Sequence, residues 1–287
     1  MLNKKIDQII SHISKTIESC NKKYIFLSLD FFFISLLLEI NKDINLLVKE
    51  VGNFILSEYA GKKNKIILIQ AYNLSFPQSL LFDKSASLSI PSALNSYLLK
   101  DGRINRTDNP MYSFFYSSDD GSLGGLNQSR IFGNESVFSS IIDLDTCLIT
   151  LGQHYVASLT SIHHAEHLGK VKYREEKDYY GKTIDYDGTE YQSHAKFFAR
   201  KINECSFSGL TNYGDKVILS KPNIAFRHNM DNANGLYGYV VNLKKVNEML
   251  LDDIFSNQKL IGVIKPGGSE KNISSPRYER SVYMEKR

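Results

Sequence analysis

Three short runs of apolar residues constrain the fold of this chain more than any other feature. They occupy residues 24–29, 65–70 and 147–149, and the third is closed by the turn residue Gly152. A strand with one face in water alternates apolar and polar residues, whereas a continuous run is typical of a strand covered on both faces. The sequence therefore predicts an α/β protein with helices on both sides of a sheet.

Helical patterns separate and follow these runs. Isoleucines at helical spacing predict an amphipathic helix over residues 2–20, and a dense apolar pattern predicts a helix over residues 31–60. The Tyr-, Asp- and Gly-rich residues 178–195 predict a loop or hairpin, and residues 103–116 a polar loop that runs into an aromatic strand. Further helices are expected at residues 89–99, from 132–138 onward, after Thr160, at 194–204 and at 243–255.

Length and composition indicate one globular domain. The chain has 287 residues, of which 42% are hydrophobic, and it shows neither an internal repeat nor a linker. We expect a single domain over residues 1–264. Residues 265–287 are polar and poor in apolar side chains, which predicts a C-terminal tail.

Cysteines and terminal signals indicate a cytoplasmic protein. The three cysteines are odd in number and far apart, so they form neither a disulfide framework nor a metal-binding pattern. The N-terminus lacks the apolar core of a signal peptide. The most apolar stretch, residues 26–40, contains Asp30 and is shorter than the about 20 apolar residues of a membrane span. We expect no membrane association.

The charge balance is mildly basic. A net charge of +4 and a pI near 8.7 fit either a solvated surface or a preference for anionic ligands. No stripe of Lys and Arg interleaved with aromatic residues is present, so we expect no nucleic-acid partner. The glycines of residues 121–125 match neither GxGxxG nor the Walker pattern. A homodimer is compatible with the sequence.

Three of the seven histidines lie within five residues directly after the third apolar run. They are His163, His164 and His167, with Glu166 among them. Ligands of open α/β sheets sit at the carboxyl ends of strands, and a neutral imidazole is well matched to general-base chemistry near neutral pH. The alternatives are a buried structural histidine or a zinc site from His163 and His167. The order HHAEH differs from HExxH and no third ligand is near, so we expect no metal.

Three blocks of residues resemble a known family. The first runs from Phe82-Asp83 to Ser113, the second is residues 132–136, and the third joins Leu151-Gly152 to residues 160–166. Together they resemble the aminoglycoside 3-N-acetyltransferases, which use acetyl-CoA. The likeness extends over roughly residues 20–180, where residues 171–174 also match a family Pro-Tyr-Arg segment.

This resemblance implies a three-layer α/β sandwich with a central mixed sheet flanked by helices, as in the antibiotic N-acetyltransferases. It also implies acetyl-CoA as co-substrate and transfer of its acetyl group to the amine of an amino-sugar substrate. His163 aligns with the family's catalytic histidine. Glu166 would share its helix face, and the carboxylate that orients the imidazole could also be Glu204 or Asp215.

The resemblance further implies a cofactor-binding set of Ser28, Arg106, Ser113, Thr160 and Ser161. Thr160 is the expected N-cap of a helix, and the backbone N–H groups beside it are candidates for holding the thioester oxygen. Arg103 and Lys84 are further candidates for the CoA phosphates. The chain departs from the family where a His-Pro pair is Asn109-Pro110 and where a His-Ser-Ser motif is Ser28-Leu29-Asp30.

Charge separates two acceptor classes. Aminoglycosides are polycations and need an acidic cleft, whereas this chain is net basic. We therefore expect a nucleotide-linked amino sugar used for a surface polysaccharide, with aminoglycoside resistance as the alternative. A third interpretation is a family member that has lost catalysis and only binds.

Overall fold

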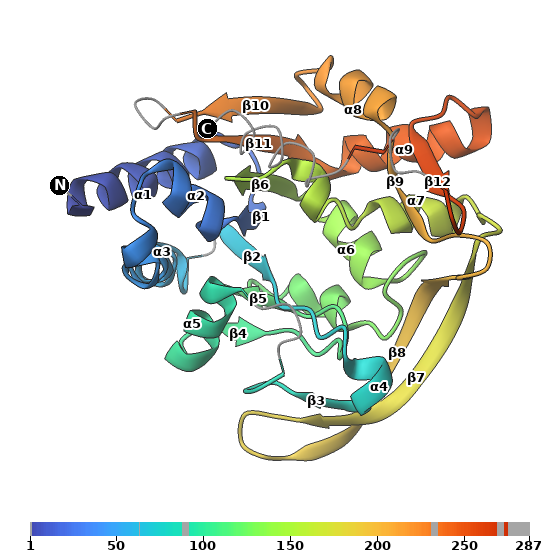
Figure 1. The fold of residues 1–287 in the computed structure, drawn as a ribbon. Helices are drawn as coiled ribbons and strands as arrows, with labels where there is room; N and C mark the ends of the chain where they lie inside the picture. The colour runs from blue at the N-terminus through green and yellow to red at the C-terminus, as the bar shows by residue number, and fades with distance from the viewer. Residues whose placement is uncertain (1, 63, 88–91, 231–234, 269–272, 275–287) are drawn as a thin grey trace.

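The computed structural model describes residues 2–62, 64–87, 92–230, 235–268 and 273–274. Its centre is a seven-stranded mixed sheet with the order β10-β11-β6-β1-β2-β5-β4 (Figure 1). The three apolar runs form its parallel middle, which consists of β6 (Cys147–Leu151), β1 (Tyr24–Leu29) and β2 (Ile66–Gln70). The sheet is completed on both sides by antiparallel strands: β11 (Tyr237–Asn242), β10 (Ala225–Asn229), β5 (Phe114–Tyr116) and β4 (Asn105–Arg106).

Alternate residues of β1 enter two different cores. Tyr24 and Phe26 pack in one apolar cluster, and Ile25 and Leu27 pack in the other. Because successive side chains of a strand point to opposite faces, a fully apolar strand requires cover on both sides. One face is covered by α1 (Leu2–Ser19), α2 (Phe31–Leu37), α3 (Ile44–Tyr59) and α5 (Ala93–Asp101); the other is covered by α6 (Val137–Asp143), α7 (Ile162–Leu168) and α9 (Leu243–Ser256) (Figure 1). The predicted three-layer α/β sandwich is confirmed.

A long hairpin extends from the second helical layer. Its strands β7 (Arg174–Ile184) and β8 (Glu190–Arg200) pair along their whole length, and β3 (Leu81–Asp83) adds in parallel to β7. We call β7 and β8 the hairpin arm; it sweeps beneath the second layer in Figure 1. The remaining elements are β9 (Phe207–Leu210), β12 (Ile261–Ile264), α4 (Phe76–Ser79), α8 (Asn212–Leu219) and the 3-10 turns η1 (Asn41–Asp43), η2 (Leu123–Asn127) and η3 (Tyr155–Ser158).

Two predicted helices differ from the structure. Residues 194–200 belong to strand β8, so the helix expected over 194–204 is wrong, whereas the hairpin expected over 178–195 is confirmed. The helix expected over 31–60 is interrupted: α2 ends at Leu37, and Glu39 adopts a φ of +57° before η1 and α3 begin. A left-handed residue cannot continue a right-handed helix.

Parts of two predictions lie outside the described residues. Of the helix expected over residues 89–99, residues 89–91 are outside, and α5 begins after its N-cap Ser92. Residues 269–272 and 275–287 of the expected tail are also outside. None of the helices in the described ranges is both long and apolar enough to cross a membrane.

Candidate active site

The connection from β6 to α7 places the histidine segment at the carboxyl edge of the parallel strands. Gly152 turns the chain with a φ of +75°, and a Cβ there would lie 3.0 Å from the Asp30 carbonyl oxygen. Only glycine adopts this conformation without strain beside such a close backbone. The helix α7 begins one residue later than expected: Ser161, not Thr160, is its N-cap, and its side chain makes no capping hydrogen bond.

His163 is held by a buried carboxylate on the same helix. Its Nδ1 lies 2.7 Å from Glu166 Oε2, and the Glu166 side chain is fully buried. The Tyr173 hydroxyl donates to Glu166 Oε1 at 3.0 Å, and Arg174 Nε lies 2.7 Å from Glu166 Oε2. Because a carboxylate only accepts hydrogen bonds, Nδ1 carries the imidazole proton and Nε2 is left to take one.

The environment favours a neutral imidazole beside an ionised carboxylate. Burial lowers the pKa of His163, against the opposing influence of Glu166. Burial alone would raise the pKa of Glu166, but the charges of His163 and Arg174 and the hydrogen bonds around the carboxylate outweigh it and lower that pKa. His163 is therefore largely neutral near pH 7, which is the state that a general base requires.

Arg174 compensates the buried charge of Glu166. Its guanidinium also donates to the Phe198 carbonyl oxygen at 3.0 Å and to Ser208 Oγ at 2.8 Å, and it lies 3.0 Å from His163 Nδ1. The sequence matched Arg174 to a family block without giving it a role, and it gave no signal for Ser208. That serine lies on β9, so only the tertiary fold brings it close to Arg174.

His163 and Arg174 line a cavity of about 560 Å³, which we call the histidine cavity. Its walls come from α4, α7, β9 and the hairpin arm. The other lining residues are Leu74, Pro77, Gln78, Met111, Tyr112, Tyr179, Phe197, Arg200, Ile202, Phe207 and Ser208.

A second cavity of about 370 Å³ opens at the carboxyl ends of β1 and β2, and we call it the strand-end cavity. Ser28 lies in its wall, where its Oγ accepts from Gln153 Nε2 at 2.6 Å and contacts Ser158 Oγ at 2.8 Å. Ser158 is the last residue of η3, five positions before His163. The connection that carries the imidazole therefore also forms the polar contacts beside the second cavity.

Arg106 and Ser113, both expected at the cofactor, contact each other inside the protein. Arg106 is 3% exposed, and its guanidinium donates to Ser113 Oγ and to the carbonyl oxygens of Lys84 and Ala71. It also lies over the ring of Phe82, 4.6 Å from the centroid. These contacts support a structural role for the pair, and their predicted part in cofactor binding stays a prediction.

The other cations expected at CoA phosphates are paired with carboxylates. Lys84 bridges Asp108 and Asp185, and Arg103 pairs with Asp101. Ser161 differs from these groups, because its Oγ is buried and has no hydrogen-bond partner in the described residues. An orphaned hydroxyl at the start of α7 is compatible with the expected role of Thr160 and Ser161 beside the thioester.

Of the three carboxylates expected near the imidazole, only Glu166 reaches it. Glu204 is exposed and pairs with Lys201 at 3.6 Å. Asp215 accepts from the Tyr155 hydroxyl at 2.7 Å and lies 3.3 Å from His154 Nε2. The structure therefore does not bring Glu204 or Asp215 to His163.

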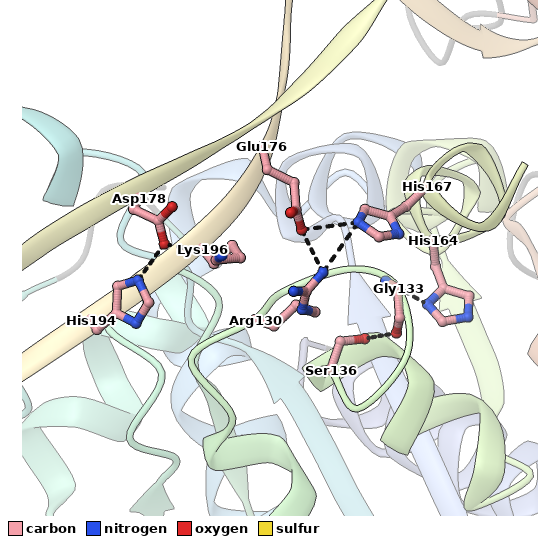
Figure 2. A network of polar contacts seen from close by, with 9 residues as sticks. All are labelled: Arg130, Gly133, Ser136, His164, His167, Glu176, Asp178, His194 and Lys196. Atoms are coloured by element: carbon pink, nitrogen blue, oxygen red, sulfur yellow. Dashed lines mark hydrogen bonds and ion pairs between the residues drawn. The ribbon is translucent and has the colours of Figure 1, made fainter. Parts of the chain in front are cut away.

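The neighbouring histidines serve a different set of contacts, drawn in Figure 2. His164 Nδ1 lies 3.3 Å from the backbone nitrogen of Gly133, and His167 Nε2 lies 3.0 Å from Glu176 Oε1, which Arg130 also contacts at 2.5 Å. These contacts join α7 to the turn before α6 and to the hairpin arm. Within the described residues, no group of three or more potential metal ligands forms.

Comparisons with known proteins identify the fold. No family model and no curated protein matches the sequence. Among solved structures, AAC-VIa bound to sisomicin superposes with a TM-score of 0.61 at 10% identity, covering 89% of this chain and 97% of that one. AAC(3)-Xa, an aminoglycoside acetyltransferase, gives 0.57 at 13% identity, covering 89% of this chain and 93% of that one.

A third structure, AAC-IIIb in a binary complex with CoASH, gives a TM-score of 0.59 at 13% identity and covers 86% of this chain and 95% of that one. The agreement extends over nearly the full length of each of these proteins. The chain therefore has the fold of the aminoglycoside 3-N-acetyltransferases.

Proposed function

We propose that this chain is an acetyl-CoA-dependent N-acetyltransferase that acts on a sugar amine, with His163 as general base. The observation that carries the proposal is the buried Glu166 carboxylate on Nδ1 of a neutral imidazole that lines a cavity. This arrangement is what proton abstraction from an amine near neutral pH requires. The shared fold supports the same reaction class.

In the proposed step, His163 Nε2 takes a proton from the acceptor ammonium. The freed amine nitrogen attacks the thioester carbonyl carbon, a C–N bond forms and the C–S bond breaks. The nitrogen loses its second proton as it becomes the amide, that proton goes to the departing CoA thiolate, and the imidazolium returns the first proton to water. Glu166 holds the tautomer and stabilises the imidazolium that forms. Burial opposes ionisation of Glu166, but His163 and Arg174 together lower the pKa of that carboxyl.

The strand-end cavity is suited to the acyl donor. Its wall contains polar side chains that can form hydrogen bonds, at the edge of the sheet where ligands of α/β proteins bind. These are Ser28, Gln70, Asn95 and Gln153. A neighbour in the same fold is in complex with CoASH, which supports acetyl-CoA as co-substrate. The polar contact between Ser158 and Ser28 would hold the wall of this cavity against the segment that leads into α7.

The solved neighbours support aminoglycosides as acceptors more directly than nucleotide-linked amino sugars, because one of them is bound to sisomicin. The net positive charge of the chain supports the nucleotide-linked class. The test is release of free thiol from acetyl-CoA with both acceptor classes, and mass spectrometry of the acetylated product. Acceptor-dependent release is expected; its absence with every amine, in protein that binds CoA, would contradict the proposal.

A further inference from the structure

Charge is distributed unevenly around the histidine cavity. Its lining contains two arginines, Arg174 and Arg200, and no Asp or Glu among the described residues. Arg174 already forms an ion pair with Glu166. A polycationic acceptor would enter this cavity without a carboxylate on its wall to receive it.

Arg200 is the second arginine of the cavity lining. It lies on the hairpin arm directly opposite Arg174 in the β7–β8 register. Within the described part of the chain, its guanidinium donates only to the Ser206 carbonyl oxygen, and no carboxylate pairs with it. An exposed guanidinium has further N–H donors arranged to bind a phosphate or carboxylate in two contacts.

The carboxylates of the hairpin arm are already paired. Figure 2 shows Glu176 between Arg130 and His167, and Asp178 against His194 and Lys196.

Also on the arm, Glu175 pairs with Lys177, and Glu204, in the turn after β8, pairs with Lys201. The local charge near Arg200 is therefore positive, because each of these acids already has a cation.

Apolar and aromatic side chains form the rest of the wall. Ile202 is 82% exposed and Phe207 41% exposed at the mouth of the cavity, and deeper in, Tyr112 stacks on Phe197 with ring centroids 5.8 Å apart. Such a surface gains free energy by covering an aromatic or apolar ring, and it offers little to a fully hydrated polyol.

We propose that the acceptor carries a phosphate and an aromatic base beside its amine, as in a nucleotide-linked amino sugar, and that Arg200 is the residue that selects it. The phosphate pairs with the guanidinium, and the base covers Phe207 and Ile202. The inference rests on the proposed function for the reaction, but anion binding at Arg200 does not depend on it. The same positive field disfavours an aminoglycoside.

The experiment uses the full chain with four amines: UDP-glucosamine, glucosamine 1-phosphate, glucosamine and sisomicin. Thiol release gives kcat and KM for each, and calorimetry gives the binding of UDP-glucosamine without acetyl-CoA. The variants are Arg200→Glu and Arg200→Lys. The control is Arg227→Glu, which makes the same charge change on β10, where Arg227 lies over the Tyr237 ring.

We expect kcat/KM to be highest for UDP-glucosamine, lower for glucosamine 1-phosphate, lower again for glucosamine and lowest for sisomicin. Arg200→Glu should raise the KM for UDP-glucosamine at least about tenfold, and Arg200→Lys should restore part of the loss. If glucosamine 1-phosphate is a better acceptor than UDP-glucosamine, the anion site at Arg200 is supported and the proposed binding of an aromatic base is wrong.

The two proposals fail separately. If UDP-glucosamine binds in an Arg200-dependent way but no amine is acetylated, the acetyl-transfer function is wrong and the anion site stands. If sisomicin is the best acceptor, or if Arg200→Glu and Arg227→Glu behave alike, the anion site is wrong and the enzyme assignment stands. Absence of both binding and turnover overturns both.

Discussion

At the residue scale, the site depends on one buried carboxylate that contacts both an imidazole and a guanidinium. Glu166 accepts from Tyr173, holds His163 Nδ1 at 2.7 Å and lies 2.7 Å from Arg174 Nε. Burying a lone carboxylate would cost several kcal/mol, so the two neighbours are what allow an ionised group at full burial. The dyad is therefore sensitive to loss of any member.

The titration of His163 tests this arrangement directly. Its pKa is lowered by burial and raised by Glu166, so we expect a value below 6.5 in the native protein and a lower one still in Glu166→Gln. The measurement is the 13Cε1 chemical shift of His163 against pH, with the signal assigned from His163→Asn. A His163 pKa above 6.5 in the native protein, or a higher His163 pKa in Glu166→Gln than in the native protein, would contradict the assigned contacts.

Substitution of Glu166 should also cost stability. Glu166→Gln keeps the shape but leaves Arg174, 3% exposed as a side chain, without its counter-charge, and breaking a buried pair in this way costs about 3–5 kcal/mol. Glu204→Gln removes an exposed partner of Lys201 and should change the free energy of unfolding by less than about 0.5 kcal/mol. Chemical denaturation of the two variants gives the comparison; equal effects would count against the buried pair.

How far the site could be predicted depended on sequence distance. His163 and Glu166 were predictable because residues three apart share a helix face. Arg200 was not, because it reaches the cavity through strand pairing with Arg174, twenty-six positions away, and register is invisible in a single sequence. Glu204 was proposed because the orienting carboxylate of the family it resembles lies further along the chain, and the fold leaves Glu204 exposed.

At the element scale, the turn before α6 supports the helix that carries the imidazole. Ser136 caps α6 and donates to the Gly133 carbonyl oxygen at 2.5 Å, while His164 and His167 pack on the same turn. The resemblance in the sequence marked this segment, and the structure gives it a physical role: it packs against α7, where the Phe132 ring also lies 5.6 Å from the His163 ring.

Gly133→Ala should destabilise the protein and lower acetyl transfer together. Gly133 has a φ of +96°, and a Cβ there would lie 2.3 Å from His167 Nδ1, so we expect a loss of about 1–3 kcal/mol and a shifted α7. Gly121→Ala is the control, since its φ is +89° with nothing within 4 Å. Equal changes in Tm for the two variants would show that the contact with His167 is unimportant.

Local pattern failed where long-range pairing decided the element. Residues 194–200 include two alanines and a lysine, which favour a helix, yet they form β8 because each pairs with a residue of β7. The strands β1, β2 and β6 were predictable, because short continuous apolar runs bounded by turn residues are typical of buried strands.

At the scale of the whole molecule, buried histidines tie stability to pH. Burial lowers the pKa of His164 and of His228 to about 4, below the 6.5 of the unfolded chain. Between these values the unfolded state binds more protons, so the free energy of unfolding falls as pH drops from 6.5 towards 4. We expect a lower Tm at pH 5 than at pH 7, and a smaller difference in His228→Gln. The same pH dependence in wild type and variant would exclude His228 as a source.

We assign His163 as the general base of an acetyl transfer. The most direct test of this assignment is thiol release from acetyl-CoA by wild type, His163→Ala and His194→Ala, with the best acceptor found and with Tm as a check on folding. His194 pairs with Asp178 outside the cavity. We expect at least about a 100-fold loss of kcat in His163→Ala protein that still unfolds cooperatively, and wild-type activity in His194→Ala. Full activity in a folded His163→Ala protein would contradict it.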